Sequence, residues 1–324
     1  MTNYTSSMED INNSPVLSIK QIMEADFPEI QWVIDKLLAP GLTLLAGPPK
    51  VGKSWLALQI AQAVGSGKPI LGRNTKQGPC LYFALEDSPQ RIRTRVDLQK
   101  WDKNSPVKVV TIGKLNFLYN KYQFDSFGEG LVNDIKQNNY RVVIIDTLSR
   151  LNSTIDQNKI DEVTSFLSPL QKIGHDKNCS IILIDHHKKT NDYFDKNVIS
   201  DVLGSVGKGA VPDTIIGFYR NKNKKTAELI ITGRDIEDNE FPLKFDSNSG
   251  IWEIDIDAKE NELPLQMSVV INFISTNGEV KEKDIVEHLK KDKGNVHKLL
   301  SKMVNENLLT KKKSGKSNIY SIPQ

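Results

Sequence analysis

Residues 47 to 55 of the 324-residue chain read Gly47-Pro48-Pro49-Lys50-Val51-Gly52-Lys53-Ser54-Trp55, and this stretch decides the fold. Its first eight residues match the pattern G-x-x-x-x-G-K-[ST] at every fixed position. A short apolar run at 42–46 precedes it and predicts a buried strand, and residues 55–64 repeat apolar side chains at helical spacing. Strand, glycine-rich loop and helix are the context in which this pattern forms a phosphate-binding loop.

We expect residues 47–55 to bind ATP. Glycines let backbone N–H groups turn inward around phosphates, and the N-terminus of the following helix adds its positive dipole. We expect Lys53 to reach the β- and γ-phosphates and the Ser54 hydroxyl to bind Mg²⁺. The alternative is a Gly/Pro turn that only joins a strand to a helix, and the flanking pattern disfavours it.

The overall composition is that of an ordinary globular protein, with 26% charged and 38% hydrophobic residues. The net charge of +3 is too small to indicate a polyanionic partner by itself. Cys80 and Cys179 each begin an apolar run without a neighbour at metal-ligand spacing, so we expect buried, reduced thiols. No apolar run approaches the roughly 18 residues that span a bilayer, and the N-terminus lacks a signal-peptide core. We therefore expect a cytoplasmic protein.

From residue 42 onward, apolar runs alternate with helical patterns, which predicts an α/β fold with a mainly parallel sheet. The apolar runs lie at 42–46, 80–85, 107–112, 142–145 and 180–184, and the helical segments at 54–64, 89–99, 129–137 and 160–173. Later runs at 214–219, 227–232 and 251–254 predict an antiparallel extension of the sheet edge. Ligands in such sheets bind outside the carboxyl ends of the strands, so the chemistry is expected there.

The two ends of the chain differ from this pattern. Residues 1–14 predict a disordered tail, and 18–25 a short capped helix leading into an ATPase domain at 15–256. The acidic, polar residues 257–264 predict a linker. Helical segments at 266–276, 281–291 and 295–305, followed by a hairpin at 308–322, predict a small winged-helix domain at 265–324.

Two strand ends carry carboxylates that we expect to act on ATP. Asp146 ends a hydrophobic strand, where it can hold the waters around Mg²⁺; the alternative is an ordinary helix N-cap. Glu86 ends the second apolar run, where it can polarise the water that attacks the γ-phosphate. The neighbouring Asp87 is a rival base or the cap of the next helix, and a solvated acidic turn is the remaining alternative.

Three further side chains at strand ends are candidates for the reaction. His186 is expected to hydrogen-bond the γ-phosphate as a sensor, with a purely structural role as the alternative. Arg220 and Arg234 end later strands, and either can reach a neighbouring subunit's γ-phosphate as an arginine finger. Salt bridges from these arginines to Asp235 or Glu237 are the competing interpretation.

The long polar segment 191–211, ending in Gly204-Ser-Val-Gly-Lys208-Gly, has two interpretations. It is either a loop that moves with nucleotide state and touches a phosphate backbone, or a solvated flexible loop.

The ordered set of these motifs resembles the RecA-type core of plasmid RepA-like hexameric helicases. The resemblance covers about residues 15 to 255. It rests on Gly47–Ser54, Glu86, Asp146-Thr-Leu-Ser-Arg150, His186-His187, Gly204-Ser205 with Asp213-Thr-Ile-Ile, and Thr232-Gly-Arg234-Asp235. Replicative helicases of the DnaB kind and the KaiC and RadA ATPases are more distant relatives. The resemblance implies a homo-oligomeric, hexameric ring with ATP bound between subunits. It also implies Glu86 as catalytic base, His186 as γ-phosphate sensor, and Arg220 or Arg234 as finger. The winged helix departs from that pattern.

Charge is unevenly distributed, because residues 264–324 hold eleven lysines against six acidic residues. Lys311-Lys312-Lys313 and Lys316 flank the expected hairpin turn, where a wing meets phosphates. We therefore expect the tail to bind nucleic acid, with a protein-docking module as the alternative.

The sequence thus predicts a Mg-dependent ATPase that translocates on or unwinds DNA, with single-stranded DNA as its partner, in replication of a plasmid, phage or other mobile element. The first alternative is an ATP-switched DNA-binding or regulatory protein without unwinding activity. A defence-associated or signalling ATPase whose tail binds a protein is the second.

Overall fold

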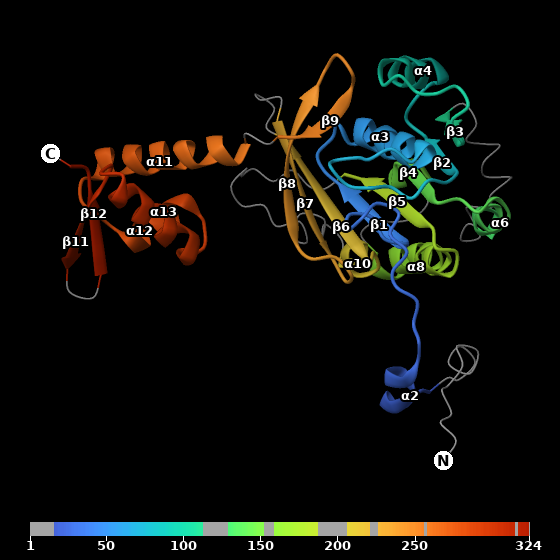
Figure 1. Cartoon of the computed structure of the whole chain (residues 1–324), viewed down its shortest axis with the longest axis horizontal. Coiled ribbons are helices and arrows are strands. Elements are labelled where there is room, and N and C mark those ends of the chain that lie inside the picture. The colour runs from blue at the N-terminus through green and yellow to red at the C-terminus, as the bar shows by residue number, and fades with distance from the viewer. Residues whose placement is uncertain are drawn as a thin grey trace.

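A computed structural model describes residues 16–112, 129–151, 159–186, 206–220, 226–255, 258–314 and 317–323 (Figure 1). The predicted disordered tail at 1–14 lies outside these residues, as do His187 and most of the segment 191–211.

A nine-stranded sheet forms the centre of the described chain, in the order β3-β2-β4-β5-β1-β6-β7-β8-β9. The strands from β3 to β6 in this order run parallel, and β7, β8 and β9 continue the sheet antiparallel. In chain order the strands are β1 (Gly41–Ala46), β2 (Cys80–Ala84), β3 (Val107–Thr111), β4 (Val142–Asp146), β5 (Ser180–Asp185), β6 (Thr214–Arg220), β7 (Thr226–Gly233), β8 (Asn239–Asp246) and β9 (Ile251–Ile254). The predicted parallel sheet with an antiparallel edge extension is confirmed.

Helices cover both faces of this sheet (Figure 1). The apolar side chains of α3 (Lys53–Ser66) and α4 (Pro89–Leu98) join one hydrophobic cluster. Those of α6 (Glu129–Asn138) and α8 (Ile160–Asp176) join the other. The central strand β1 separates the clusters, because Leu44 and Leu45 point to opposite faces and enter different ones. The short helices α7 (Leu148–Leu151) and α10 (Val206–Ala210) follow β4 and precede β6.

The pattern did not predict strand β8, and Pro242 gives the reason. Proline cannot donate to a β-ladder, so it lowers the strand character of the sequence around it. Here Pro242 pairs with Glu228 of β7, but the β8–β9 ladder begins only at Leu243, so Pro242 sits where β8 is an outer strand.

The C-terminal residues form a separate unit with its own hydrophobic cluster (Figure 1). Its elements are α11 (Ala258–Asn277), β10 (Val280–Lys281), α12 (Glu282–Leu289), α13 (Lys293–Asn305), β11 (Thr310–Ser314) and β12 (Ser317–Ser321). The strands form an antiparallel sheet in the order β10-β12-β11. Helix α11 begins at Ala258, so its first turns occupy residues that the sequence predicted as a linker.

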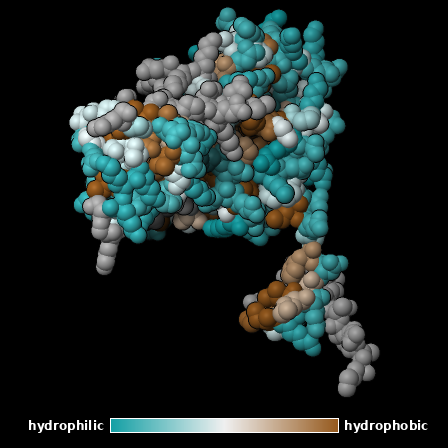
Figure 2. Space-filling view, turned by 60° about the vertical axis from the view of Figure 1, so that its left-hand side comes forward, coloured by the Kyte–Doolittle hydropathy of each residue, from teal (hydrophilic) through white to brown (hydrophobic). Residues whose placement is uncertain are grey.

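At the other end of the described chain, α2 (Ile19–Glu24) is the predicted capped helix, with Ser18 and Gln21 forming a capping box. None of its residues is buried. The lobe that carries α2 displays an apolar patch (Figure 2). The exposed large apolar residues of this segment are Val16, Ile19, Ile22, Met23, Phe27 and Ile30.

Within the described residues, no helix combines the length and the apolar character that crossing a membrane requires.

Candidate nucleotide-binding site

The loop between β1 and α3 takes its shape from two glycines that no other residue could replace without displacing a neighbour. A Cβ at Gly47 would lie 2.5 Å from the Phe218 carbonyl oxygen, and one at Gly52 would lie 2.6 Å from the Trp252 ring. Gly52 also has φ +117°, a backbone conformation that residues with side chains rarely adopt. The motif glycines are therefore required by a close approach of β6 and β9 as well as by the loop.

Helix α3 begins at Lys53, directly after the loop, and Gly52 offers no side chain to cap it. The first N–H groups of a helix lack helical acceptors and carry the positive end of its dipole. This arrangement suits an anion held by the loop.

The Lys53 ammonium lies in the middle of the loop. Its Nζ donates to the carbonyl oxygens of Gly47 at 2.7 Å and Pro48 at 2.9 Å. Burial lowers the pKa of Lys53 to about 8, although three nearby carboxylates act in the opposite direction. Phosphate oxygens in the loop would therefore meet an ammonium that has little access to water.

Parallel register brings four strand ends into one row across the sheet. Ala46 of β1 pairs with Asp185 of β5, and Asp146 of β4 pairs with Ile184 of β5 and Ala84 of β2. The residues that follow these strands thus emerge at the same edge as the phosphate-binding loop. This register explains how Glu86, Asp146 and His186 come to lie beside Lys53.

Asp146 is buried and lies against Ser54. The Ser54 side chain hydrogen-bonds the Asp146 carboxylate, and the Tyr82 hydroxyl donates to its Oδ2 at 2.9 Å. Burial raises the pKa of Asp146, and these two hydrogen bonds act against that rise. A hydroxyl and a carboxylate are the oxygen ligands that Mg²⁺ prefers, so the two residues fit the metal expected with ATP.

Glu86 and Asp87 have different surroundings, which favour Glu86 as the candidate base. Asp87 is buried and accepts hydrogen bonds from Arg91 at 2.9 Å and Arg95 at 2.5 Å. Glu86 is 42% exposed, and the Thr147 hydroxyl donates to its Oε1 at 3.1 Å. Asp87 is not the cap of α4 either, because the N-cap is the next residue, a serine.

His186 directly follows β5 and faces the loop. Its Nδ1 lies 3.3 Å from the Lys53 Nζ. An ammonium only donates, so Nδ1 accepts and the ring proton of a neutral His186 resides on Nε2. The exposed imidazole therefore has a second nitrogen available to an oxygen of a bound phosphate.

The two candidate arginines lie at neighbouring strands, β6 and β7, but at opposite ends of this pair. Arg220 lies beyond the end of β1, where its guanidinium donates to the Val51 carbonyl at 3.3 Å and stands over the rings of Phe245 and Trp252. Arg234 follows β7, which is antiparallel to β6, so it lies beside the start of β1. Arg234 is level with Asp213, so seven residue steps along β6 separate the two positions by roughly 23 Å.

Arg234 belongs to a polar network around the buried Asp213. The Asp213 carboxylate accepts from Arg234 at 3.4 Å, Gln171 at 2.7 Å and the Leu42 N–H at 2.9 Å, and lies 3.0 Å from His175. The sequence had suggested Asp235 or Glu237 as partners of the arginine. It marked Asp213 only as part of the motif that resembles RepA-like helicases, and did not pair it with Arg234, which is 21 positions away.

Trp252 supports the phosphate-binding loop from behind, a role that no pattern in the sequence indicates. Its indole N–H donates to the Gly52 carbonyl at 3.3 Å. The Gln59 side chain, nearly two turns into α3, hydrogen-bonds both the backbone N–H and the carbonyl of Trp252, each at 2.9 Å. Phe218 and Phe245 pack edge-on or tilted against the same indole.

Lys208 is not an exposed phosphate contact, as the sequence had allowed for the loop 191–211. It lies on α10, buried, and forms an ion pair with Asp185, the last residue of β5. The side chain is thus engaged inside the fold, and α10 is fastened to the strand that precedes His186.

The chain matches one family model and is similar to several solved structures. The model of the family described as AAA domain matches residues 11–192. Among solved structures, the chain is similar to a KaiC-like protein from Pyrococcus horikoshii (14% identity, 68% of this chain and 93% of that one, TM-score 0.46). It is also similar to the RadB recombinase (19% identity, 67% and 92%, TM-score 0.47).

A third similar structure is that of a DnaB-like replicative helicase, solved to show its interactions with primase. Identity is 17%, the match covers 66% of this chain and 57% of that one, and the TM-score is 0.50. At this level of identity the similarity extends to the fold, which is that of RecA-type P-loop ATPases.

Proposed function

Because the chain belongs to the AAA domain family, we propose that it is a RecA-type ATPase that uses ATP hydrolysis to move along or unwind DNA. The observation that carries this proposal is the gathering of Lys53, Ser54, Asp146, Glu86 and His186 around one phosphate-binding loop. They lie at or beyond the carboxyl ends of four neighbouring strands of a single sheet.

In the proposed reaction each side chain has one task. Backbone N–H groups of residues 47–55 and the Lys53 ammonium bind the phosphates, and Ser54 and Asp146 hold Mg²⁺, which neutralises phosphate charge. Glu86 accepts the proton of the attacking water, and its hydrogen bond from Thr147 fixes the orientation of the carboxylate. His186 hydrogen-bonds the γ-phosphate and, through its contact with Lys53, responds to its loss.

The proposal includes a homo-oligomeric, hexameric ring with Arg220 or Arg234 acting on a neighbour's nucleotide. One feature that supports self-association is the exposed apolar surface of residues 16–30. Contiguous apolar side chains on a projecting segment are typical of surfaces that pack against another chain.

We assign the ATPase function to residues 15–256 and propose that residues 265–324 form a winged-helix domain that contacts nucleic acid. Three helices, a two-stranded hairpin and a third short strand, together with the excess of lysine, support this assignment. Replication of a plasmid, phage or other mobile element is the proposed setting, because the motif set resembles RepA-like helicases.

The alternative is an ATPase that binds DNA in response to ATP, in regulation or defence, without separating strands. The separate basic C-terminal unit favours this alternative, since it provides DNA contacts that do not depend on a central channel.

Hydrolysis and strand displacement on a forked DNA test the proposal directly. ATPase activity stimulated by single-stranded DNA, together with displacement of one strand, is the expected result. DNA binding that responds to ATP but displaces nothing would favour the alternative. No DNA binding in any nucleotide state would contradict both.

A further inference from the structure

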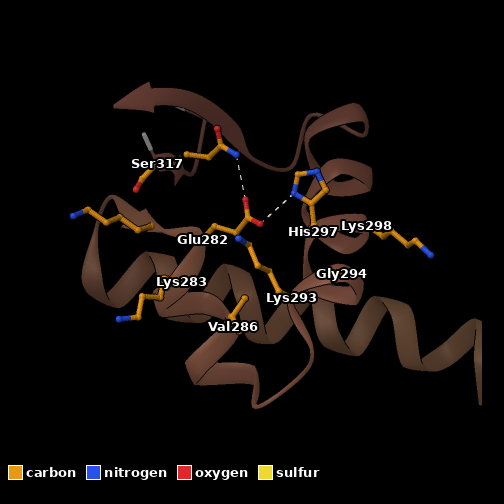
Figure 3. Close-up of a pocket in the computed structure, with 10 residues that line it drawn as sticks. Glu282, Lys283, Val286, Lys293, Gly294, His297, Lys298 and Ser317 are labelled. Atoms are coloured by element: carbon orange, nitrogen blue, oxygen red, sulfur yellow. Dashed lines mark hydrogen bonds and ion pairs between the residues drawn. The ribbon is translucent and has the colours of Figure 1, made fainter. Parts of the chain in front are cut away.

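The C-terminal unit contains an open groove of about 800 Å³ between α12, α13 and the start of β12 (Figure 3). Four lysines line it, with Lys281 and Lys283 near the start of α12 and Lys293 and Lys298 on the first turns of α13. The groove therefore has positive charge on two sides. The function proposed above gives this domain a contact with nucleic acid but does not say which of its surfaces makes that contact.

The one acidic residue among those lining this groove, Glu282, is engaged by three donors. Its carboxylate accepts from Asn318 at 3.2 Å and from the Tyr320 hydroxyl at 3.3 Å. Its Oε1 lies 3.2 Å from the His297 Nδ1 (Figure 3). Burial alone would raise the pKa of Glu282, but the hydrogen bonds from Asn318 and His297 outweigh it and lower the pKa. Glu282 thus joins α12, α13 and β12 and fixes the width of the groove.

The register of the β11–β12 ladder extends the basic surface beyond the groove. Lys313 pairs with Asn318 and Lys311 with Tyr320, and directly opposed residues in an antiparallel ladder point to the same face. That face is the one from which Asn318 and Tyr320 reach Glu282. Lys312 points to the other face, where it pairs with Glu279 at 3.3 Å.

The kind of partner follows from what lines the groove besides lysine. Apart from Glu282 and His297, the described lining residues are valine, glycine, serine and asparagine, without phenylalanine, tyrosine or tryptophan. Proteins that hold single strands stack bases on aromatic side chains, whereas contacts to a duplex are mostly to its phosphates. This groove has lysine side chains on two walls and no aromatic side chain on which a base could stack. It therefore suits the phosphate backbone of a duplex better than a single strand.

We propose that this groove, with Lys311 and Lys313 beside it, binds the phosphate backbone of duplex DNA independently of base sequence. The inference rests on the proposed action on DNA and adds a second site, distinct in substrate from the single strand expected at the ATPase. The tail would then hold the unopened duplex.

The test uses the full-length protein and fluorescence anisotropy with a labelled mixed-sequence duplex and with each of its single strands, over a range of salt concentrations. Lys293→Ala/Lys298→Ala should weaken duplex binding for every sequence tried. Each lost phosphate contact lowers the slope of log K against log salt by about 1, so the double variant should lower it by about 2.

The matched control is Lys302→Ala/Lys172→Ala, which removes the same charge from α13 and α8. Both of these lysines lie outside the groove in exposed ion pairs, with Glu306 at 3.7 Å and Asp176 at 3.3 Å. This variant should bind the duplex with the salt slope of the wild type. The proposal would be overturned if the groove variant and the wild type showed equal slopes of log K against log salt for the duplex. It would also be overturned if the groove variant lost binding only to an acidic polypeptide such as polyglutamate and kept its binding to the duplex.

The groove can fail independently of the proposed function. DNA-free ATP hydrolysis should be the same in the groove variant and the wild type, because the substitutions lie outside the ATPase site. A wild type that displaces strands while the groove variant keeps full duplex binding would leave the motor proposal intact and remove the groove. If instead the wild type displaces no strand but its duplex binding depends on Lys293 and Lys298, the groove proposal stands and the motor proposal falls.

Discussion

Glu86 and Asp87 are adjacent in the chain, yet only Glu86 is exposed at the edge that carries the phosphate-binding loop. Glu86→Gln keeps the shape and the hydrogen bond from Thr147 but removes the proton acceptor. We expect ATP binding to persist while kcat falls by at least about 100-fold, the lower range for a general base. Steady-state hydrolysis and a fluorescent ATP analogue measure the two quantities.

Glu253→Gln provides the matched control, because Glu253 is an exposed glutamate of β9. Its kcat should remain that of the wild type. Wild-type hydrolysis by Glu86→Gln would remove Glu86 from the mechanism and reopen the assignment of the base.

At the scale of single elements, β9 acts on the loop through Trp252. Trp252→Phe keeps an aromatic ring but loses the hydrogen bond to the Gly52 carbonyl and leaves space beside Gly52. A hydrogen bond of about 1 kcal/mol corresponds to about a fivefold change in an equilibrium constant, so KM for ATP should rise by about that factor, with a smaller change in kcat.

Trp32→Phe is the comparison for this substitution, since Trp32 packs partly buried against the same hydrophobic cluster. It should leave KM unchanged. An unchanged KM in Trp252→Phe would show that the loop holds its shape without the indole.

Helix α10 is attached to β5 by the buried pair of Lys208 and Asp185. Lys208→Met leaves the Asp185 carboxylate buried without its cation, which costs about 3–5 kcal/mol of unfolding free energy. Asp185→Asn/Lys208→Met removes both charges and should recover most of that loss. Urea unfolding of the four proteins of this double-mutant cycle checks the prediction, and equal stability of Lys208→Met and the wild type would contradict it.

The sequence predicts features whose residues are close together in the chain better than contacts between residues that are far apart in it. The loop at 47–55 is local, and the sequence singles out Asp146, Glu86 and His186 as candidates because each lies at the end of an apolar run. Parallel register aligns these runs with β1. The sequence pattern could not predict the contact of Trp252 with Gly52, which are 200 positions apart. A tryptophan in an apolar strand is expected in any hydrophobic core, and the pattern does not say which residue it contacts. It likewise could not pair Lys208 with Asp185, because burial of a lysine depends on a specific partner from another element.

At the scale of the whole molecule, the two arginines differ in position. Mixing variants can show whether each one acts on the ATP site of its own subunit or on that of a neighbour. Arg234→Ala should lower kcat by on the order of 1,000-fold if Arg234 acts as a finger. Mixing it with Lys53→Ala should then restore hydrolysis, because the Lys53→Ala subunits supply an intact Arg234 to neighbours with an intact loop. Absence of complementation would count against a shared site.

Arg220 gives the contrasting case, since its guanidinium contacts the loop of its own chain at Val51. A mixture of Arg220→Ala with Lys53→Ala should show no more activity than the two proteins measured separately. Recovery in this mixture instead would identify Arg220 as the residue that crosses to the neighbour.

The strand that carries Trp252 has a mechanical consequence. Strand β9 ends at Ile254, and α11 begins at Ala258, so the C-terminal unit is joined to the core through this strand. The β8–β9 ladder has four paired positions, and the Gln59 side chain clamps Trp252 to α3. Tension on DNA held by the tail would enter the core along β9 and arrive at the back of the phosphate-binding loop. The same four-residue strand would let a load on the DNA set the rate at which the loop exchanges its nucleotide.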